Sequence, residues 1–172
     1  IAISAQLSSR PRSMGSLSWQ LNDAWTSISW SSIDYLSNKK ALHYKLSEIY
    51  APILLGLDIK DKGLYDVWVS NDLQRDIDGR VRIIVEDMEG NQMFAFSEKA
   101  DVKANSCYRL PNKVNINTLN KKKSECYARV IFLEDDTILS ERIHFFTCPK
   151  NLELIETEIN PNTNFKDGKY YI

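Results

Sequence analysis

The stretch Arg80-Val-Arg-Ile-Ile-Val-Glu-Asp87 carries the clearest structural pattern in the chain. Val81, Ile83 and Val85 alternate with charged residues, so an extended strand here would have one apolar face and one charged face. This alternation is typical of an antiparallel sheet with one face in the core and the other in water. We therefore predict a strand over Arg80–Asp87 in a sheet of that kind.

The same two-residue period continues on both sides of this strand, from Ile53 to Phe146. Turn signals separate the segments at Glu89-Gly90-Asn91 and Glu134-Asp135-Asp136-Thr137, and Gly79 indicates a further turn. The predicted strands are Ile53–Ile59, Tyr65–Ser70, Arg80–Asp87, Met93–Ser97, Tyr108–Leu110, Glu125–Glu134 and Ile138–Thr147. Short strands at intervals of about ten residues predict an antiparallel β-sandwich of the immunoglobulin class.

The first fifty residues have a different character. Leu17–Leu21 alternates and predicts a short strand, and Asn22-Asp23 favours a turn after it. A loop is expected from about residue 24 to 37. Apolar residues at helical spacing then predict a helix over Lys39–Tyr50, which Pro52 would stop.

Charge and hydropathy exclude two classes of partner. The chain has 22 basic and 23 acidic residues, so it offers no basic field for nucleic acid or an anionic membrane. No apolar run approaches the roughly 20 residues of a membrane span. We expect neither nucleic acid nor a membrane as a partner.

The cysteines and histidines do not suggest a metal or a redox site. Cys107, Cys126 and Cys148 form no C-x-x-C pair, so a zinc site is not indicated. A Cys107–Cys126 disulfide stays open, but we favour three buried thiols outside any disulfide. His43 and His144 lie 101 residues apart and are predicted as structural residues of a helix and a strand. No cofactor and no metal are predicted.

The polar residues beside the tryptophans form the one cluster with chemical interest. Trp19-Gln-Leu-Asn-Asp-Ala-Trp25 is followed closely by Trp30. Indole faces stack on the apolar face of a pyranose, while amides and carboxylates bind its hydroxyls. From composition alone, core tryptophans beside a plain Asn22-Asp23 turn rank above a sugar site.

A resemblance changes that ranking. The residues that carry it are Met14-Gly-Ser-Leu-Ser-Trp-Gln-Leu-Asn-Asp-Ala-Trp25, Ser29-Trp-Ser-Ser-Ile-Asp-Tyr35, Lys40-Ala-Leu-His-Tyr44 and Tyr50-Ala-Pro52. Together they resemble the end of the catalytic domain of family 2 glycoside hydrolases, and within that family they are most similar to β-mannosidases. Phe145–Leu152 also resembles the joint between the two C-terminal β-domains of β-mannosidases. Ser18, Thr26 and Ser37–Lys39 depart from the family pattern and mark a divergent member.

The resemblance implies a domain organisation. Residues 1–51 would be the C-terminal end of a (β/α)8 catalytic domain, with Leu17–Leu21 as its last strand and Lys39–Tyr50 as its last helix. Residues 52–148 would be the immunoglobulin-like sandwich, and 149–172 a linker with the start of a further β-domain. The fold class is therefore mainly β, preceded by the end of a barrel, and we expect the chain to be part of a larger protein.

The resemblance also implies a reaction for the parent protein. Family members hydrolyse terminal, non-reducing β-D-mannose residues with retention, using two glutamates. Both glutamates belong to earlier barrel strands, and Asp23 and Asp34 match non-catalytic positions, so no residue of this chain is predicted to be catalytic. Barrel active sites lie at the carboxyl ends of the strands. The predicted substrate-binding residues are Trp19, Asn22, Asp23 and Trp25, and the partner of the parent is a β-mannoside oligosaccharide.

Three further expectations follow for this chain. We expect the chain itself to be inactive and its helix to pack on the sandwich. The strand segment should either pair with another copy of the chain, which would make the chain self-associate, or lie disordered. Related enzymes often hold a cis peptide after the corresponding tryptophan, but without a complete barrel we expect Trp19-Gln20 to be trans. The resemblance fits a periplasmic, secreted or lysosomal parent, although the sequence does not define the compartment.

A second reading of the sandwich stays open. It would be a carbohydrate-binding or purely structural module of another family 2 glycosidase, such as a β-galactosidase-like enzyme. In a binding module, Trp68 would face outward as a stacking platform, but a single ring within a strand is more often part of a core.

Overall fold

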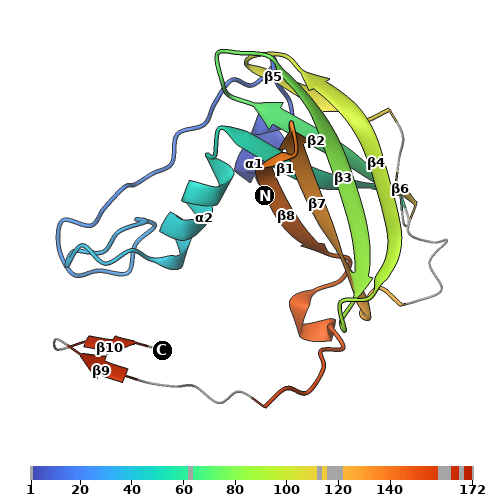
Figure 1. Cartoon of the computed structure of the whole chain (residues 1–172). Coiled ribbons are helices and arrows are strands. Elements are labelled where there is room, and N and C mark those ends of the chain that lie inside the picture. Colours follow the sequence, from blue (N-terminus) through green and yellow to red (C-terminus); the bar gives the residue numbers. More distant parts are fainter. Residues whose placement is uncertain are drawn as a thin grey trace.

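The computed structural model describes residues 2–61, 64–111, 114–115, 122–158, 164–166 and 169–171. Two short helices, α1 (Ala2–Leu7) and α2 (Ala41–Ile49), precede a set of strands (Figure 1). The strands are β1 (Ile53–Asp61), β2 (Leu64–Asn71), β3 (Ile77–Asp87), β4 (Gln92–Val102), β5 (Ser106–Arg109), β6 (Val114–Asn115), β7 (Cys126–Glu134) and β8 (Thr137–Phe145). A 3-10 turn at Pro149–Asn151 and a small hairpin of β9 (Asn164–Lys166) and β10 (Lys169–Tyr171) follow.

The strands form two antiparallel sheets packed face to face. One sheet has the order β4-β3-β7-β8, and the other has the order β1-β2-β5 with β6 beside β2 (Figure 1). Alternate residues of each strand point between the sheets, as Val81, Ile83 and Val85 of β3 do, and all three are fully buried. The mainly β, immunoglobulin-like sandwich predicted from the sequence is confirmed.

The predicted strands are confirmed with shifted ends, and so is the hairpin between β7 and β8. Asp135 and Asp136 form its turn with φ angles of 47° and 63°. The turn predicted at Gly79 is wrong, because this glycine lies within β3. A Cβ there would come within 2.5 Å of the ring of Phe132, so a close approach between strands requires the glycine.

The residues before the sandwich differ more from prediction. The helix predicted over Lys39–Tyr50 is confirmed as α2, whereas α1 was not predicted. The strand predicted at Leu17–Leu21 is wrong, because these residues have no ladder partner among the described strands. The Trp19-Gln20 peptide bond is cis, so the expected trans bond is also wrong.

Both helices pack on the outer face of the β1-β2-β5 sheet. Leu7 of α1 and Ile49 of α2 cover Leu54 and Trp68, which point away from the main core. Arg10 secures this contact, because its buried guanidinium binds Asp72 at 2.7 Å and the carbonyl oxygen of Asn71 at 3.2 Å. The expectation that the helix packs on the sandwich is confirmed.

The sulfur and aromatic predictions have mixed outcomes. None of the three cysteines forms a disulfide, and Cys126 is buried as expected. The prediction of three buried thiols is wrong for Cys148, which is exposed, and for Cys107, which is only partly buried. Cys148 directly precedes the 3-10 turn after β8, and Cys107 lies on the outer side of its sheet. Trp68 is 2% exposed, which excludes an outward stacking platform.

Candidate functional site

The segment between α1 and α2 carries the residues predicted to bind sugar. It projects from the sandwich as an extended loop that returns through α2 (Figure 1). Isolated bridges pair Asn22 with Ile33 and Ile33 with Lys39, and the Lys40 amide donates to the carbonyl oxygen of Ser32 at 2.9 Å. Backbone contacts therefore hold residues 20–40 in a defined shape without a regular strand.

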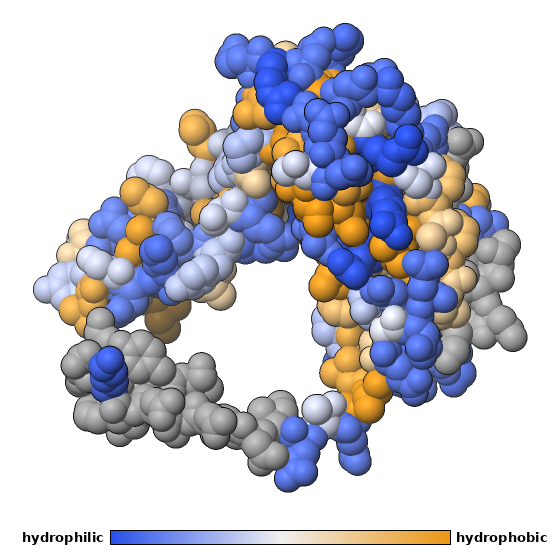
Figure 2. Space-filling view, viewed as in Figure 1, coloured by the Kyte–Doolittle hydropathy of each residue, from blue (hydrophilic) through white to orange (hydrophobic). Residues whose placement is uncertain are grey.

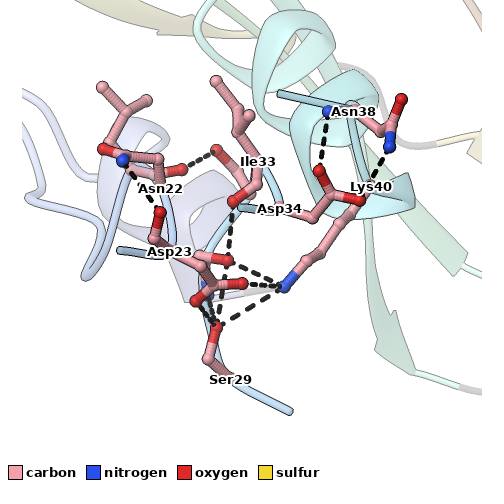
Figure 3. Close-up of polar contacts among 10 residues, drawn as sticks. Asn22, Asp23, Ser29, Ile33, Asp34, Asn38 and Lys40 are labelled. Atoms are coloured by element: carbon pink, nitrogen blue, oxygen red, sulfur yellow. Dashed lines mark hydrogen bonds and ion pairs between the residues drawn. The ribbon is translucent and has the colours of Figure 1, made fainter. Parts of the chain in front are cut away.

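An ion pair closes this loop from inside. Lys40 Nζ lies 2.9 Å from Oδ2 of Asp23 and donates to Ser31 Oγ at 2.7 Å (Figure 3). Ser29 Oγ donates to the other carboxylate oxygen of Asp23 and lies 3.0 Å from Ser31 Oγ. Asp23 is only 6% exposed, so this network joins the start, middle and end of the loop.

The network fixes the charge of Asp23. Hydrogen bonds from Ser29 and then Lys40 lower the pKa of Asp23 from 3.8 to about 2. The carboxylate is therefore ionised at neutral pH and is turned into the loop. Its role in the described structure is to hold the loop together.

The second acid of the loop, Asp34, is also structural. Its Oδ1 accepts a hydrogen bond from the Asn38 amide at 2.7 Å, and its Oδ2 accepts one from Asn38 Nδ2 at 3.0 Å (Figure 3). These bonds lower the pKa of Asp34. They close the turn that contains Ser37, whose φ of 68° lies in the left-handed region.

The aromatic residues of the loop face solvent. Trp19, Trp25 and Trp30 are 79%, 70% and 82% exposed, and Asn22 is also exposed. The reading of these tryptophans as core residues does not hold for the described chain. Their indole faces are free for contact with a ligand or with further protein.

The four predicted residues have different environments, since Asp23 is buried while Trp19, Asn22 and Trp25 are exposed. Asn22 and Asp23 are neighbours at the bridge to Ile33, and Asn22 Nδ2 donates to the carbonyl oxygen of Asp23 at 3.2 Å. A cavity of about 310 Å³ lies between the loop and α2 and is lined by Ser18, Gln20, Leu21, Ser32, His43, Leu46, Ser47 and Tyr50. Trp19 and Trp25 do not line it.

The surface around the loop is unusually apolar. Figure 2 shows apolar surface on the lobe that the loop and α2 form. The large apolar side chains exposed there are Met14, Leu17, Trp19, Leu21, Trp25, Ile28, Trp30, Tyr35, Leu36, Leu42, Tyr44 and Tyr50. Exposed apolar surface on this scale marks a site of interaction with other protein or with a ligand.

The described part of the chain has neither a metal cluster nor a membrane-spanning helix. Residues 2–61, 64–111 and the shorter described ranges after them contain no cluster of acidic, histidine and cysteine side chains suited to a metal ion. Over those residues, no helix has the length and hydropathy needed to cross a bilayer.

Comparison with known families identifies the sandwich. The model of the Mannosidase Ig/CBM-like domain family matches residues 63–151, which is more than half of the chain. The chain belongs to this family. The matched residues run from the start of β2 to the turn after β8, so the Mannosidase Ig/CBM-like domain coincides with most of the sandwich.

Curated relatives with similar sequences are β-mannosidases. "Beta-mannosidase" of Rattus norvegicus is 43% identical over 63 residues, which cover 37% of this chain and 7% of the relative. "Beta-mannosidase A" of Aspergillus oryzae is 36% identical over 83 residues, which cover 48% of this chain and 9% of the relative. The chain thus spans less than a tenth of the length of these relatives, and the resemblance to β-mannosidases seen in its sequence is confirmed.

Solved structures share the fold. The β-D-mannosidase of Dictyoglomus thermophilum matches with a TM-score of 0.79 and 23% identity, over 94% of this chain and 20% of that chain. The exo-chitosanase CsxA of Amycolatopsis orientalis matches with a TM-score of 0.60 and 14% identity, over 74% of this chain and 15% of that chain. The first match extends beyond the sandwich into the residues before it.

Sequence reasoning missed the residues that hold the loop. Ser29, Ser31 and Lys40 belong to the segments that resemble the family, but nothing in the sequence links them to Asp23. The ion pair spans 17 residues with no helical or strand period between them, so no sequence pattern signals it. The high density of serine after Trp25 was the one available hint of a polar network.

Proposed function

We propose that this chain contributes the end of the catalytic domain and an accessory sandwich to a larger β-mannosidase. The parent would hydrolyse terminal, non-reducing β-D-mannose residues with retention of configuration. The observation that carries this proposal is the 36% identity over 83 residues with a β-mannosidase A. The sandwich would be a non-catalytic module that packs on the barrel.

In this proposal the exposed loop forms part of the sugar pocket. Trp19 and Trp25 would offer indole faces, and Asn22 would bind hydroxyl groups of the terminal sugar. Asp23 was predicted as a substrate-binding residue together with them. It would act indirectly, because its ion pair with Lys40 would hold the loop in shape. The exposed apolar side chains of the same lobe would pack against the remaining barrel strands of the parent. Two of those strands would also pair with residues 17–21, which have no strand partner in this chain.

Catalysis would depend on carboxylates outside this chain. Retaining glycosidases need an acid and a nucleophile about 5–5.5 Å apart. Asp23 is bound to Lys40 and Asp34 to Asn38, so neither acid of the loop is placed for this role. We expect the 172-residue chain to release no aglycone from aryl β-mannosides.

The experiment that tests the proposal uses the intact parent. Trp19→Ala should lower turnover of an aryl β-mannoside, because the stacking surface of the pocket is lost. Trp30→Ala is the matched control, since it removes an equally exposed indole of the same loop that is not assigned to the pocket. Turnover unaffected by Trp19→Ala, or activity in the isolated chain, would contradict the proposal.

A further inference from the structure

The lobe that carries the proposed sugar pocket is attached to the sandwich at both of its ends. This lobe leaves the sandwich after α1 and returns to it through α2 (Figure 1). We call residues 8–12, which follow α1, the entry segment, and residues 50–52, which lead from α2 into β1, the exit segment. The position of the lobe relative to the sandwich depends on how these two segments are held.

One residue of the sandwich binds both segments. Asp72 lies directly after β2, and its Oδ1 atom lies 2.7 Å from the guanidinium of Arg10 in the entry segment. The backbone N–H of Asp72 donates to the carbonyl oxygen of Pro52 in the exit segment at 2.8 Å. Arg10 also donates to the carbonyl oxygen of Asn71 at 3.2 Å, so its planar fork binds two neighbouring residues of the sandwich. Asn71 and Asp72 thus form a joint at which the two ends of the lobe meet.

The joint is fixed firmly within the sandwich. Asn71 is fully buried, and its Nδ2 atom lies 2.8–3.3 Å from the carbonyl oxygens of Arg75, Val102 and Lys103. Its Oδ1 atom accepts a hydrogen bond from the amide of Leu73 at 2.9 Å. Moving this side chain would break several buried hydrogen bonds at once, so the joint is a rigid reference point for the lobe.

Contacts within the lobe make it respond as one unit. The hydroxyl of Tyr50 in the exit segment donates to the carbonyl oxygen of Ser16 at 3.1 Å and lies 2.9 Å from Ser16 Oγ. Lys40, directly before α2, binds Asp23 at 2.9 Å. These contacts join the start, middle and end of residues 16–50. A shift of the entry or exit segment would therefore displace the pocket loop without opening it.

We infer that Asp72 is a positioning residue of the proposed sugar pocket and acts through Arg10 and Pro52. The accessory sandwich then has a task in the reaction, because it fixes where the loop with Trp19 and Trp25 lies. This inference rests on the proposed function, since it takes that loop as part of the pocket. A displacement of about 1 Å caused far from the reacting atoms can cost about 100-fold in rate.

Hydrogen exchange measured by mass spectrometry tests the joint in the 172-residue chain without any substrate. Asp72→Ala removes the carboxylate that binds Arg10 and keeps the backbone N–H. Peptides from residues 2–16 and 41–52 should then exchange about two- to fivefold faster, which is the effect of losing one ion pair near the surface. Peptides from β3 and β7 should exchange as before.

Asp76→Ala is the matched control. Asp76 lies in the same connection between β2 and β3, its side chain is 57% exposed compared with 55% for Asp72, and it pairs with Lys103 at 2.7 Å. This substitution should leave the exchange of the lobe unchanged. If Asp72→Ala does not fold, Arg10→Lys tests the same contact, because a single ammonium group does not reproduce the guanidinium fork. Unchanged exchange of both lobe ranges would overturn the inference.

A double-mutant cycle in the intact parent tests the link between the joint and the pocket. Asp72→Ala should lower kcat/KM for an aryl β-mannoside by about 10- to 100-fold, whereas Asp76→Ala should change it little. In a Trp19→Ala background, Asp72→Ala should cost at least about threefold less, because the displaced loop no longer carries its stacking ring. A purely structural role of Asp72 would give equal losses in the two backgrounds, and that result would overturn the inference.

The two tests distinguish this inference from the proposed function. If Trp19→Ala alone leaves turnover unchanged, the proposed pocket is wrong and the inference fails with it. If Trp19→Ala lowers turnover but Asp72→Ala changes neither hydrogen exchange nor kcat/KM, the proposed pocket stands and the positioning role of Asp72 is wrong.

Discussion

Val130 is one of the fully buried residues at which the sandwich core should not tolerate a charge. It is fully buried in β7, where it pairs with Ile83 on one side and Arg142 on the other. Val130→Asp should unfold the sandwich, because Arg142 is already bound to Glu48 and a carboxylate buried without a free partner costs several kcal/mol. Arg82→Asp is the control, since Arg82 is exposed on the adjacent strand. Circular dichroism melting curves that coincide for Val130→Asp and the parent sequence would show that the strand assignment is wrong.

The carboxylate of Asp23 should make the stability of the loop depend on pH. Its pKa lies below the usual 3.8, so the hydrogen bonds from Ser29 and then Lys40 to the carboxylate stabilise the folded loop above pH 3.8. That contribution should be lost as the pH falls from 3.8 through about 2, with no change between pH 5 and 8 from this group. The measurement is the carboxyl carbon shift of Asp23 by NMR. Asp23→Asn should abolish the transition, and a midpoint near 4 would contradict the buried pair.

At the scale of elements, α1 is an integral part of the sandwich. Leu7 is 6% exposed and lies against Ile49, Leu54 and Trp68. Leu7→Ala should lower the free energy of unfolding by about 2–5 kcal/mol, as is usual for a buried leucine. Gln6→Ala, on the exposed side of α1, should change it little. Urea denaturation measures both, and equal midpoints would show that α1 does not stabilise the sandwich.

A shortened chain tests the same contact. Residues 52–148 keep the main core, so we expect them to fold on their own. Without α1 and α2 they expose Leu54 and Trp68, so they should melt at a lower temperature than the whole chain. Calorimetry of the two chains checks this, and failure of 52–148 to fold would mean that the helices are required for the sandwich.

The elements also show where sequence reasoning succeeds. Strands such as β3 and β7 were predicted because alternation reports burial on one face, whatever the partner strand. Leu17–Leu21 alternates too, but a strand also needs a neighbouring strand to pair with. This segment has no such partner among the described strands and forms no ladder. The contacts of α1 and of the Asp23–Lys40 pair depend on residues far apart in sequence, so no local pattern predicts them. Trp19 was assigned to a sugar pocket only through a resemblance, and that assignment stays a prediction.

For the whole molecule, the apolar lobe predicts association. The loop and α2 expose a group of large apolar side chains that no described residue covers. We expect light scattering to give a mass above 19.9 kDa that rises with concentration. Replacing Trp19, Trp25 and Trp30 by serine should lower that mass, whereas Lys39→Ser should not. A 19.9 kDa monomer at every concentration would contradict the prediction that the chain self-associates.

The uneven burial of the tryptophans has a consequence for spectroscopy. Three of the four indoles are already in water in the folded chain, and only Trp68 is enclosed. The emission of the three exposed indoles is therefore red-shifted before any unfolding begins. It adds a constant background to the emission of Trp68, which is the one indole whose surroundings change when the sandwich unfolds. A denaturation curve read from total fluorescence would understate the transition, and a triple Trp→Phe variant at positions 19, 25 and 30 would leave a single clean reporter.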